Sequence, residues 1–136
     1  MRFGTSMLVF GAISMLAITI GAFPVFAQPQ GFKPNPLMRA ALSGDDTKEA
    51  VIATAEFAPG GTTGRHTHPA DEYVIVLEGT LELLVDGREP RRVSAGEAYH
   101  TAKGVIHETR NVGPGVARVS TTFITEKGQP LTQPVK

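Results

Sequence analysis

Residues 60–72 read GGTTGRHTHPADE and hold two of the four histidines of the chain, closely followed by a glutamate. In an extended segment, side chains two positions apart point to the same face. His66 and His68 would therefore present their imidazoles to one point. Pro69 stops any helix here, and Glu72 returns a carboxylate from the start of the next strand. The segment predicts a local cluster of potential metal ligands.

A third imidazole, that of His107, lies farther along the chain, shortly after Gly104. A turn at Gly104 could bring the next strand back alongside the first segment. The chain has no cysteine, so His and carboxylate are the strong ligands available to it. A lone His-x-His pair in an exposed loop is usually a solvated pair, so the assignment depends on both segments agreeing.

Short runs rich in β-branched residues recur between turn signals from residue 37 to residue 125, without sustained helical periodicity. Asp86-Gly87 is typical of a hairpin with a type I′ turn, because Gly adopts positive φ freely and Asp tolerates it. Several short strands favour an all-β sandwich or small barrel. The predicted strands are 48–57, 72–77, 80–86, 97–100, 106–111 and 116–125.

The first 27 residues have the pattern of a signal peptide. Arg2 gives a positive start, residues 8–22 are uncharged and mostly apolar, and Val25 and Ala27 stand where a signal peptidase reads small side chains. We predict cleavage after Ala27 and a periplasmic or secreted protein with no remaining membrane contact. The alternative is an uncleaved anchor, because residues 7–27 carry no charge and could just span a bilayer.

The rest of the chain divides by composition. Residues 28–36 contain three prolines and a glycine, which favours an extended tether. Residues 37–125 would form the folded domain, and residues 126–136 an irregular C-terminal tail that packs loosely or frays. Lys plus Arg and Asp plus Glu both number 13, so no basic excess would draw the chain to nucleic acid.

Two motifs in the chain resemble those of the cupin superfamily. The spacing of the first cupin motif is matched by Gly60, His66, His68, Glu72 and Gly79. The second motif is similar to the spacing of Gly96, Ala102, Gly104, His107 and Asn111. Ala102 stands where the family usually has proline, which puts only the stiffness of one turn in doubt, because proline there would supply rigidity and no ligand.

The resemblance implies a double-stranded β-helix, a small all-β barrel or jelly roll, in which the two motifs face each other. It also implies that His66, His68, Glu72 and His107 bind one divalent transition metal, with Fe, Mn, Ni, Cu and Zn all compatible with this ligand set. Four protein ligands on a six-coordinate ion leave two positions open for a small-molecule ligand or substrate.

The implied function is that of a metal-dependent cupin of the quercetin-dioxygenase-like kind, an oxygenase-like enzyme acting on a small oxygen-rich or aromatic molecule. The alternative is a non-catalytic exported cupin that binds a small ligand through its metal, and a third reading is a purely structural metal. No catalytic residue beyond the ligands is identifiable. A homodimer is one assembly that would cover edge strands and apolar outer faces.

Strand parity predicts which side chains next to the ligands face the cavity. Either Tyr99 or His100 would face the cavity, and the turn at Gly104 prevents parity from being carried over from His107. Arg65 and Asp71 would point to the opposite face from the ligands. Asn111 is predicted to end a strand as a turn residue.

Overall fold

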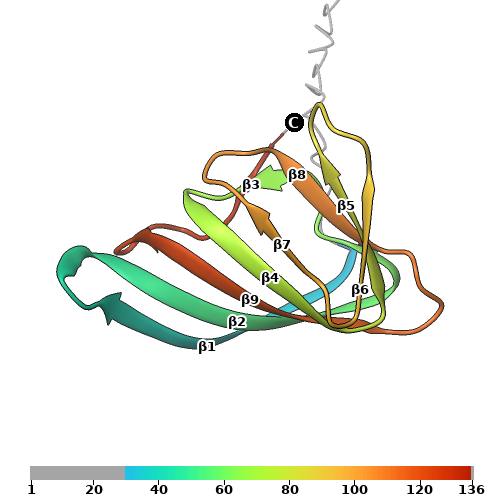
Figure 1. The fold of residues 1–136 in the computed structure, drawn as a ribbon, viewed down its shortest axis with the longest axis horizontal. Coiled ribbons are helices and arrows are strands. Elements are labelled where there is room, and N and C mark those ends of the chain that lie inside the picture. Colours follow the sequence, from blue (N-terminus) through green and yellow to red (C-terminus); the bar gives the residue numbers. More distant parts are fainter. Residues whose placement is uncertain (1–29, 136) are drawn as a thin grey trace, which may run out of the picture.

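The computed structural model describes residues 30–135, so the predicted signal peptide and its cleavage site lie outside the described residues. The regular elements in this range are β-strands (Figure 1). No helix among them is long and apolar enough to cross a membrane. The strands are β1 (Gln30–Leu42), β2 (Asp45–Thr62), β3 (His66–Thr67), β4 (Ala70–Glu78), β5 (Thr80–Val85), β6 (Arg91–Ser94), β7 (Ala98–Thr101), β8 (His107–Asn111), β9 (Ala117–Glu126) and β10 (Gln133–Pro134).

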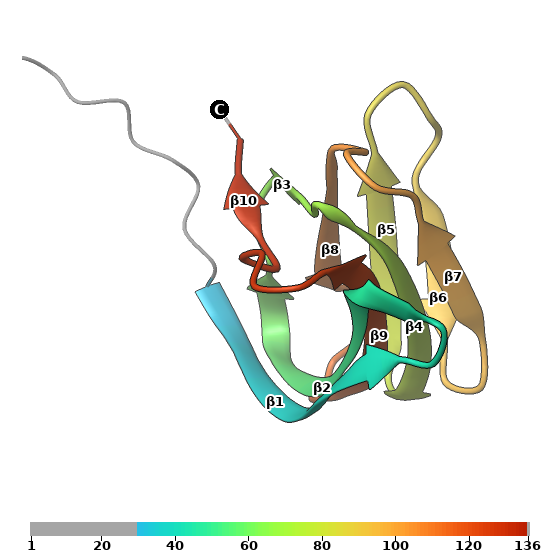
Figure 2. The same ribbon diagram turned by 90° about the vertical axis from the view of Figure 1, so that its left-hand side faces the viewer.

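The strands form a nearly closed antiparallel barrel with two faces. One face contains β1, β2, β9, β4 and β7, and the other contains β10, β3, β8, β5 and β6. The long strand β2 belongs to both, because it pairs with β9 over most of its length and with β8 at Thr62. Figure 2 shows the faces curving around a common interior. The prediction of an all-β barrel is confirmed.

The core follows from strict alternation along the strands. On β4, Val74 and Val76 are buried, whereas Tyr73 and Ile75 are exposed. Each fully buried side chain of this kind contributes about 1.5–3 kcal/mol relative to an exposed one. The main cluster is completed by inward residues of β2, β5, β6, β7 and β9, among them Phe57, Leu81, Leu83, Val93, Tyr99 and Val119.

The predicted tether over residues 28–36 is wrong where the structure describes it. From Gln30 onward these residues form the first part of β1, which pairs antiparallel with β2. Pro34 and Pro36 lie in register with Ala55 and Ala53. Among residues 30–135, β1 pairs on one side only, so it is an edge strand of the described sheet, the position where proline is tolerated. The folded domain therefore extends to the N-terminal side of the expected boundary at residue 37.

The hairpin at Asp86-Gly87 exists, but its turn differs from the prediction. Gly87 has a φ of 76°, whereas no residue other than glycine among residues 30–135 has positive φ, so the turn is not type I′. The Arg88 N–H donates to the Val85 carbonyl, which with Gly87 at the third position is typical of a type II turn. Pro90 has no N–H for the ladder, and pairing resumes after it in β6, a strand that sequence analysis missed.

The C-terminal tail is irregular in part, as predicted, but it does not simply fray. Residues 133–134 form β10 and pair with β3, and the Val135 N–H donates to the Arg65 carbonyl. Leu131 packs against the small buried cluster of Val51, Ala70 and Phe123. In Figure 2 the segment, drawn in red, crosses the mouth of the barrel. The tail is thus part of the domain.

Candidate metal centre

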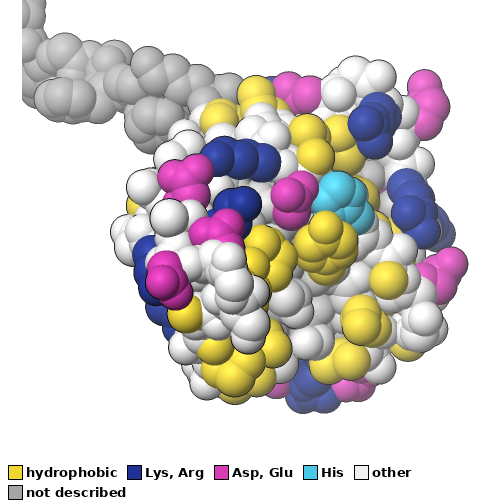
Figure 3. Space-filling view, turned by 60° about the vertical axis from the view of Figure 1, so that its left-hand side comes forward, with side chains coloured by type: hydrophobic (Ala, Val, Ile, Leu, Met, Phe, Trp, Pro, Cys, Tyr) yellow, Lys and Arg dark blue, Asp and Glu magenta, His cyan; other side chains and the backbone are white. Residues whose placement is uncertain are grey.

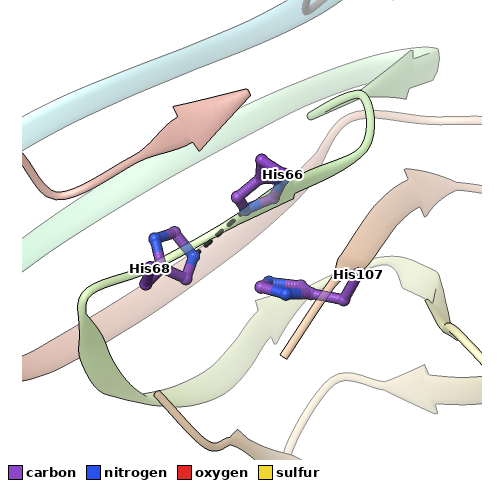
Figure 4. Close-up of side chains that lie close together, drawn as sticks. All are labelled: His66, His68 and His107. Atoms are coloured by element: carbon purple, nitrogen blue, oxygen red, sulfur yellow. Dashed lines mark hydrogen bonds between the residues drawn. The ribbon is translucent and has the colours of Figure 1, made fainter. Parts of the chain in front are cut away.

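Three histidines meet inside the barrel. His66 begins β3, His68 follows that strand, and His107 begins β8 directly opposite His66 in the ladder. Figure 4 shows their rings facing one another. The Nε2 atoms of His66 and His68 are 3.0 Å apart, and the three side chains offer ligand atoms that all lie within 4.8 Å of one another. Their residues are only 5%, 4% and 1% exposed.

Glu72 brings its carboxylate to the same point from β4. Its Oε1 lies 3.5 Å from His68 Nε2, and its Oε2 lies 3.2 Å from His107 Nε2. Oε2 is buried and accepts no hydrogen bond among the described residues. The structure therefore brings all four predicted residues together and leaves one carboxylate oxygen without a donor.

Backbone carbonyls determine which ring nitrogens point into the cluster. His66 Nδ1 lies 2.9 Å from the Gly64 carbonyl oxygen, and His107 Nδ1 lies 3.1 Å from that of Val105. His68 Nδ1 is bonded in the same way to the Leu131 carbonyl. A carbonyl can only accept, so each Nδ1 carries the proton. Each neutral ring then directs an Nε2 lone pair at the centre of the cluster.

Three lone pairs and a carboxylate repel one another unless a cation lies between them. Burial, aided by the charges of His107 and His68, lowers the pKa of His66 to about 4, so this ring is neutral at pH 7. Burial raises the pKa of Glu72, whereas protonated imidazoles of His107 and His68 facing the carboxylate outweigh this effect and lower the pKa to about 2. When the rings are neutral, a metal ion among them would supply that positive charge. Neutral imidazoles and an ionised carboxylate suit a divalent metal, so the residues present fit such an ion.

Turns on both sides hold the imidazoles in place. Gly64 has a φ of 67°, which turns its carbonyl back toward the His66 ring. The turn before His107 is closed by a hydrogen bond from the Val105 N–H to the Ala102 carbonyl. Gly104 donates its N–H to the His68 carbonyl and so ties the two motifs together. The turn forms with alanine at residue 102, as expected.

Strand pairing shows which of Tyr99 and His100 faces the cavity. Tyr99 is buried and lies opposite Val74, whereas His100 lies opposite exposed Tyr73 and stacks on its ring. Figure 3 shows a histidine beside acidic and hydrophobic side chains on the outer surface, and His100 is the exposed histidine of the four. It pairs there with Asp71 at 3.1 Å. His100 therefore does not face the cavity.

Arg65 and Asn111 have structural roles. Arg65 is exposed and forms an ion pair with Asp86 across the surface, on the opposite side from the ligands as expected. Asn111 is buried, its amide lies within hydrogen-bond distance of the carbonyls of Phe57, Ala58 and Gly115, and its Oδ1 accepts from the Gly113 N–H. It fixes the turn after β8, which agrees with the prediction of a turn residue.

A cavity of about 160 Å³ lies beside His66 and Glu72. Its walls include Tyr99, one of the two residues predicted to face the cavity, whose hydroxyl oxygen lies 3.1 Å from that of Thr109. Thr109, Phe32 of β1 and Leu131 of the tail also line the cavity and were not predicted from the sequence. Thr109 could have been found by parity, because it lies two positions after His107 on the same strand. Phe32 and Leu131 lie in segments that carried no strand pattern.

The family model for the cupin domain matches residues 53–124, more than half of the chain. The chain belongs to the cupin family. The matched range includes both ligand motifs and runs from β2 to β9. The three histidines and Glu72 lie within the matched range, whereas β1 and β10 lie outside it.

Plant germin-like proteins are among the relatives of this cupin. Germin-like protein 1-1 of Oryza sativa subsp. japonica is 36% identical over 100 residues, which are 70% of this chain and 46% of that protein. Germin-like protein subfamily 2 member 2 of Arabidopsis thaliana is 33% identical over 87 residues, 60% of this chain and 40% of that protein. This cupin thus spans less than half of the length of these relatives.

Solved structures show the same architecture. A recombinant oxalate oxidase in complex with glycolate superposes with a TM-score of 0.61 and 25% identity, over 79% of this chain and 56% of that one. The polyketide cyclase RemF from Streptomyces resistomycificus superposes with a TM-score of 0.62 and 21% identity, over 92% and 87% of the two chains. The second likeness concerns the fold alone.

Proposed function

We propose that this cupin holds one divalent transition metal on His66, His68, Glu72 and His107, and that it is an oxygenase-like enzyme for a small oxygen-rich or aromatic molecule. The observation that carries the proposal is the meeting of three Nε2 lone pairs beside the buried carboxylate of Glu72, whose Oε2 accepts no hydrogen bond from the described residues. The likeness to an oxalate oxidase bound to glycolate supports a small oxygen-rich ligand.

The bound metal would supply Lewis-acid or redox chemistry at its open positions. The chain itself contributes orientation and exclusion of water. The backbone carbonyls of Gly64, Val105 and Leu131 fix the imidazoles, and apolar walls of β1 and β9 surround the space beside them. Such a dry, rigid site strengthens every electrostatic interaction within it.

A non-catalytic binding protein is the second candidate, and one observation favours it. Apart from His66 and Glu72, the only titratable side chain among the described cavity-lining residues is Tyr99, whose pKa burial raises well above its usual value. Its phenol stays neutral at physiological pH and makes a poor base. A site that only binds a ligand through its metal needs no such base.

Turnover separates the two candidates. The purified protein would be loaded with Fe, Mn, Ni, Cu or Zn in turn, and consumption of small carboxylates and phenols would be followed together with oxygen uptake. The His68→Ala variant is the control for chemistry at the metal. Metal-dependent consumption supports the enzyme, metal-dependent binding without consumption supports the binding protein, and a protein that takes up none of these metals refutes the proposal.

Location and assembly complete the proposal. We infer export after removal of residues 1–27, which an intact-mass measurement on exported protein would test by showing a chain that starts at Gln28. The predicted homodimer would cover apolar side chains on the outer face of β4, where Tyr73, Ile75 and Leu77 are exposed. Sedimentation of the exported protein at several concentrations tests this assembly.

A further inference from the structure

The cavity beside the proposed metal site has a polar end and an apolar body. His66 and Glu72 lie at the polar end. The body is lined by Phe32, Pro34 and Pro36 of β1, by Val119 and Phe123 of β9, and by Leu131 of the tail. An apolar cavity of about 150 Å³ in another protein holds one benzene molecule, so a cavity of about 160 Å³ that includes the polar end limits the apolar body of a ligand to about one six-membered ring.

The charge of the site limits the charge of its ligand. A divalent ion bound by three neutral imidazoles and the carboxylate of Glu72 leaves one net positive charge, because ligands must be deprotonated to bind a metal. None of the described residues that line the cavity is Lys or Arg. One negative charge on a ligand is thus neutralised, whereas a second would be buried without a cation, which is costly.

The other polar groups of the cavity are neutral. They are the hydroxyls of Tyr99 and Thr109, which bond to each other, and those of Thr54, Thr63, Thr121 and Thr132. Hydroxyls can orient a ligand oxygen, but they do not compensate a full second charge. The shape of the cavity therefore favours a small apolar body, and its charge favours a single negative charge on the ligand.

We propose that the natural ligand is a monoanion with a single oxygen-bearing head group and a compact apolar body about the size of one six-membered ring. The head group would bind at the metal, and the body would lie between β1 and β9. This assignment rests on the proposed metal site. It excludes ligands such as oxalate, which carry two charged groups and no apolar body, as the natural ligand of this protein.

Calorimetric titration of the zinc-loaded protein tests the assignment, because zinc binds without redox chemistry. The probes are benzoate, acetate and oxalate at pH 7.5. We expect benzoate to bind at least about tenfold more tightly than acetate, which lacks the apolar body, and more tightly than oxalate. Removal of zinc should abolish benzoate binding. Tighter binding of oxalate than of benzoate would overturn the ligand class while leaving the metal site standing.

Two variants and a control sharpen the test. Ala53→Leu should fill part of the cavity and weaken benzoate binding about tenfold without loss of zinc, because Ala53 lines the cavity but is not a proposed ligand. Thr122→Leu, on the outer face of β9, is the matched control and should change neither. Phe32→Ala should enlarge the cavity and allow 2-naphthoate to bind.

Elemental analysis of zinc distinguishes a failure of the proposed metal site from a failure of the ligand assignment. If both Ala53→Leu and Phe32→Ala contain zinc and bind benzoate as tightly as the native protein, the ligand assignment alone is refuted. A protein without zinc would refute the proposed function, and the ligand assignment with it. Melting temperatures of the variants show whether each one is folded.

Discussion

Two of the three histidines are oriented by their own neighbourhood in the chain, whereas the third is oriented from a distance. His66 and His107 each donate Nδ1–H to the carbonyl two residues earlier. His68 donates to the carbonyl of Leu131, 63 residues later. The first arrangement is a property of two glycine-containing turns. The second exists only when the C-terminal segment is docked.

The docked segment has several points of attachment. β10 pairs with β3, the Gly128 N–H donates to Glu49 Oε1, and Leu131 packs on the cluster around Phe123. His68 itself contacts the Phe123 ring, with centroids 4.9 Å apart. The same segment thus covers the cavity and sets one ligand, so access to the site and geometry of the site are linked.

Removal of a histidine should have the largest effect, whichever way that histidine is oriented. In both His68→Ala and His107→Ala we expect a loss of metal affinity of more than about a hundredfold, because removal of a ligand exceeds the 10- to 100-fold cost of losing a ligand's supporting hydrogen bond. Competition with a chelator of known affinity measures the loss. Unchanged metal content in both variants would contradict the site.

Acid should remove the metal irrespective of orientation, because each imidazole must be neutral to bind it. The pKa of His66 is about 4 in the folded chain without metal, below the value of about 6.5 when unfolded. The unfolded chain therefore takes up a proton between these values, and stability falls as pH drops from about 6.5 to about 4. Metal lowers the folded pKa further and extends this window.

The melting temperatures of metal-loaded and chelator-treated protein test this at pH 7.5 and near pH 5 with total metal fixed. Saturating metal adds about 4 kcal/mol at a thousandfold excess over the dissociation constant, and proton competition should shrink this increment at pH 5. Equal gaps at both pH values, or none at pH 7.5, would argue against a stabilising three-histidine site.

Truncation after Gly128 tests whether His68 depends on the tail while His66 and His107 do not. It removes the Leu131 carbonyl but leaves the carbonyls of Gly64 and Val105, so we expect metal affinity to fall about 10- to 100-fold. Leu131→Ala keeps the backbone carbonyl and is the matched control, with a smaller loss from weaker packing. If truncation changed affinity no more than Leu131→Ala, the tail would not orient His68.

Much of this site could be predicted from local sequence because it depends on strand parity. The i, i+2 spacing of His66 and His68 predicts that both side chains share a face, and both are buried. The same alternation buries Glu72 together with Val74 and Val76 on β4. The orientation of Tyr99 was not predictable, because a turn breaks the parity between β7 and β8. Pairing with β4 determines it, since residues directly opposite in a ladder share a face.

Long-range packing accounts for what sequence analysis missed. Pro34 and Pro36 favour a tether over β1, yet β2 pairs with it, and no other described strand pairs with its second edge, where proline is tolerated. The tail lacks any strand pattern, and its position depends on Leu131 finding an apolar cluster assembled from β2, β4 and β9. The local sequence of β1 or of the tail does not identify the part of the protein against which it packs.

Glu72→Gln should have a smaller effect than the loss of an imidazole. The amide oxygen can still coordinate, but its charge is lost, so we expect about a tenfold weaker site with metal still detectable. Glu72→Ala is the companion variant and should weaken the site more. Competition with a chelator measures both, and a glutamine variant that binds as tightly as the native protein would show that Glu72 is not a ligand.

His100→Ala should have the smallest effect and extends the comparison to the histidine outside the cluster. Its ring stacks on Tyr73 with centroids 4.8 Å apart and pairs with Asp71 on the exposed surface. Exposed pairs of this kind contribute little, so the free energy of unfolding should change by less than about 1 kcal/mol. Metal content should be unchanged, because strand pairing points this side chain away from the three histidines. Denaturant unfolding with elemental analysis of the same samples measures both quantities. A His100→Ala protein that loses its metal would show that an outer-face residue controls the site, and strand parity would then be an insufficient guide to which histidines matter.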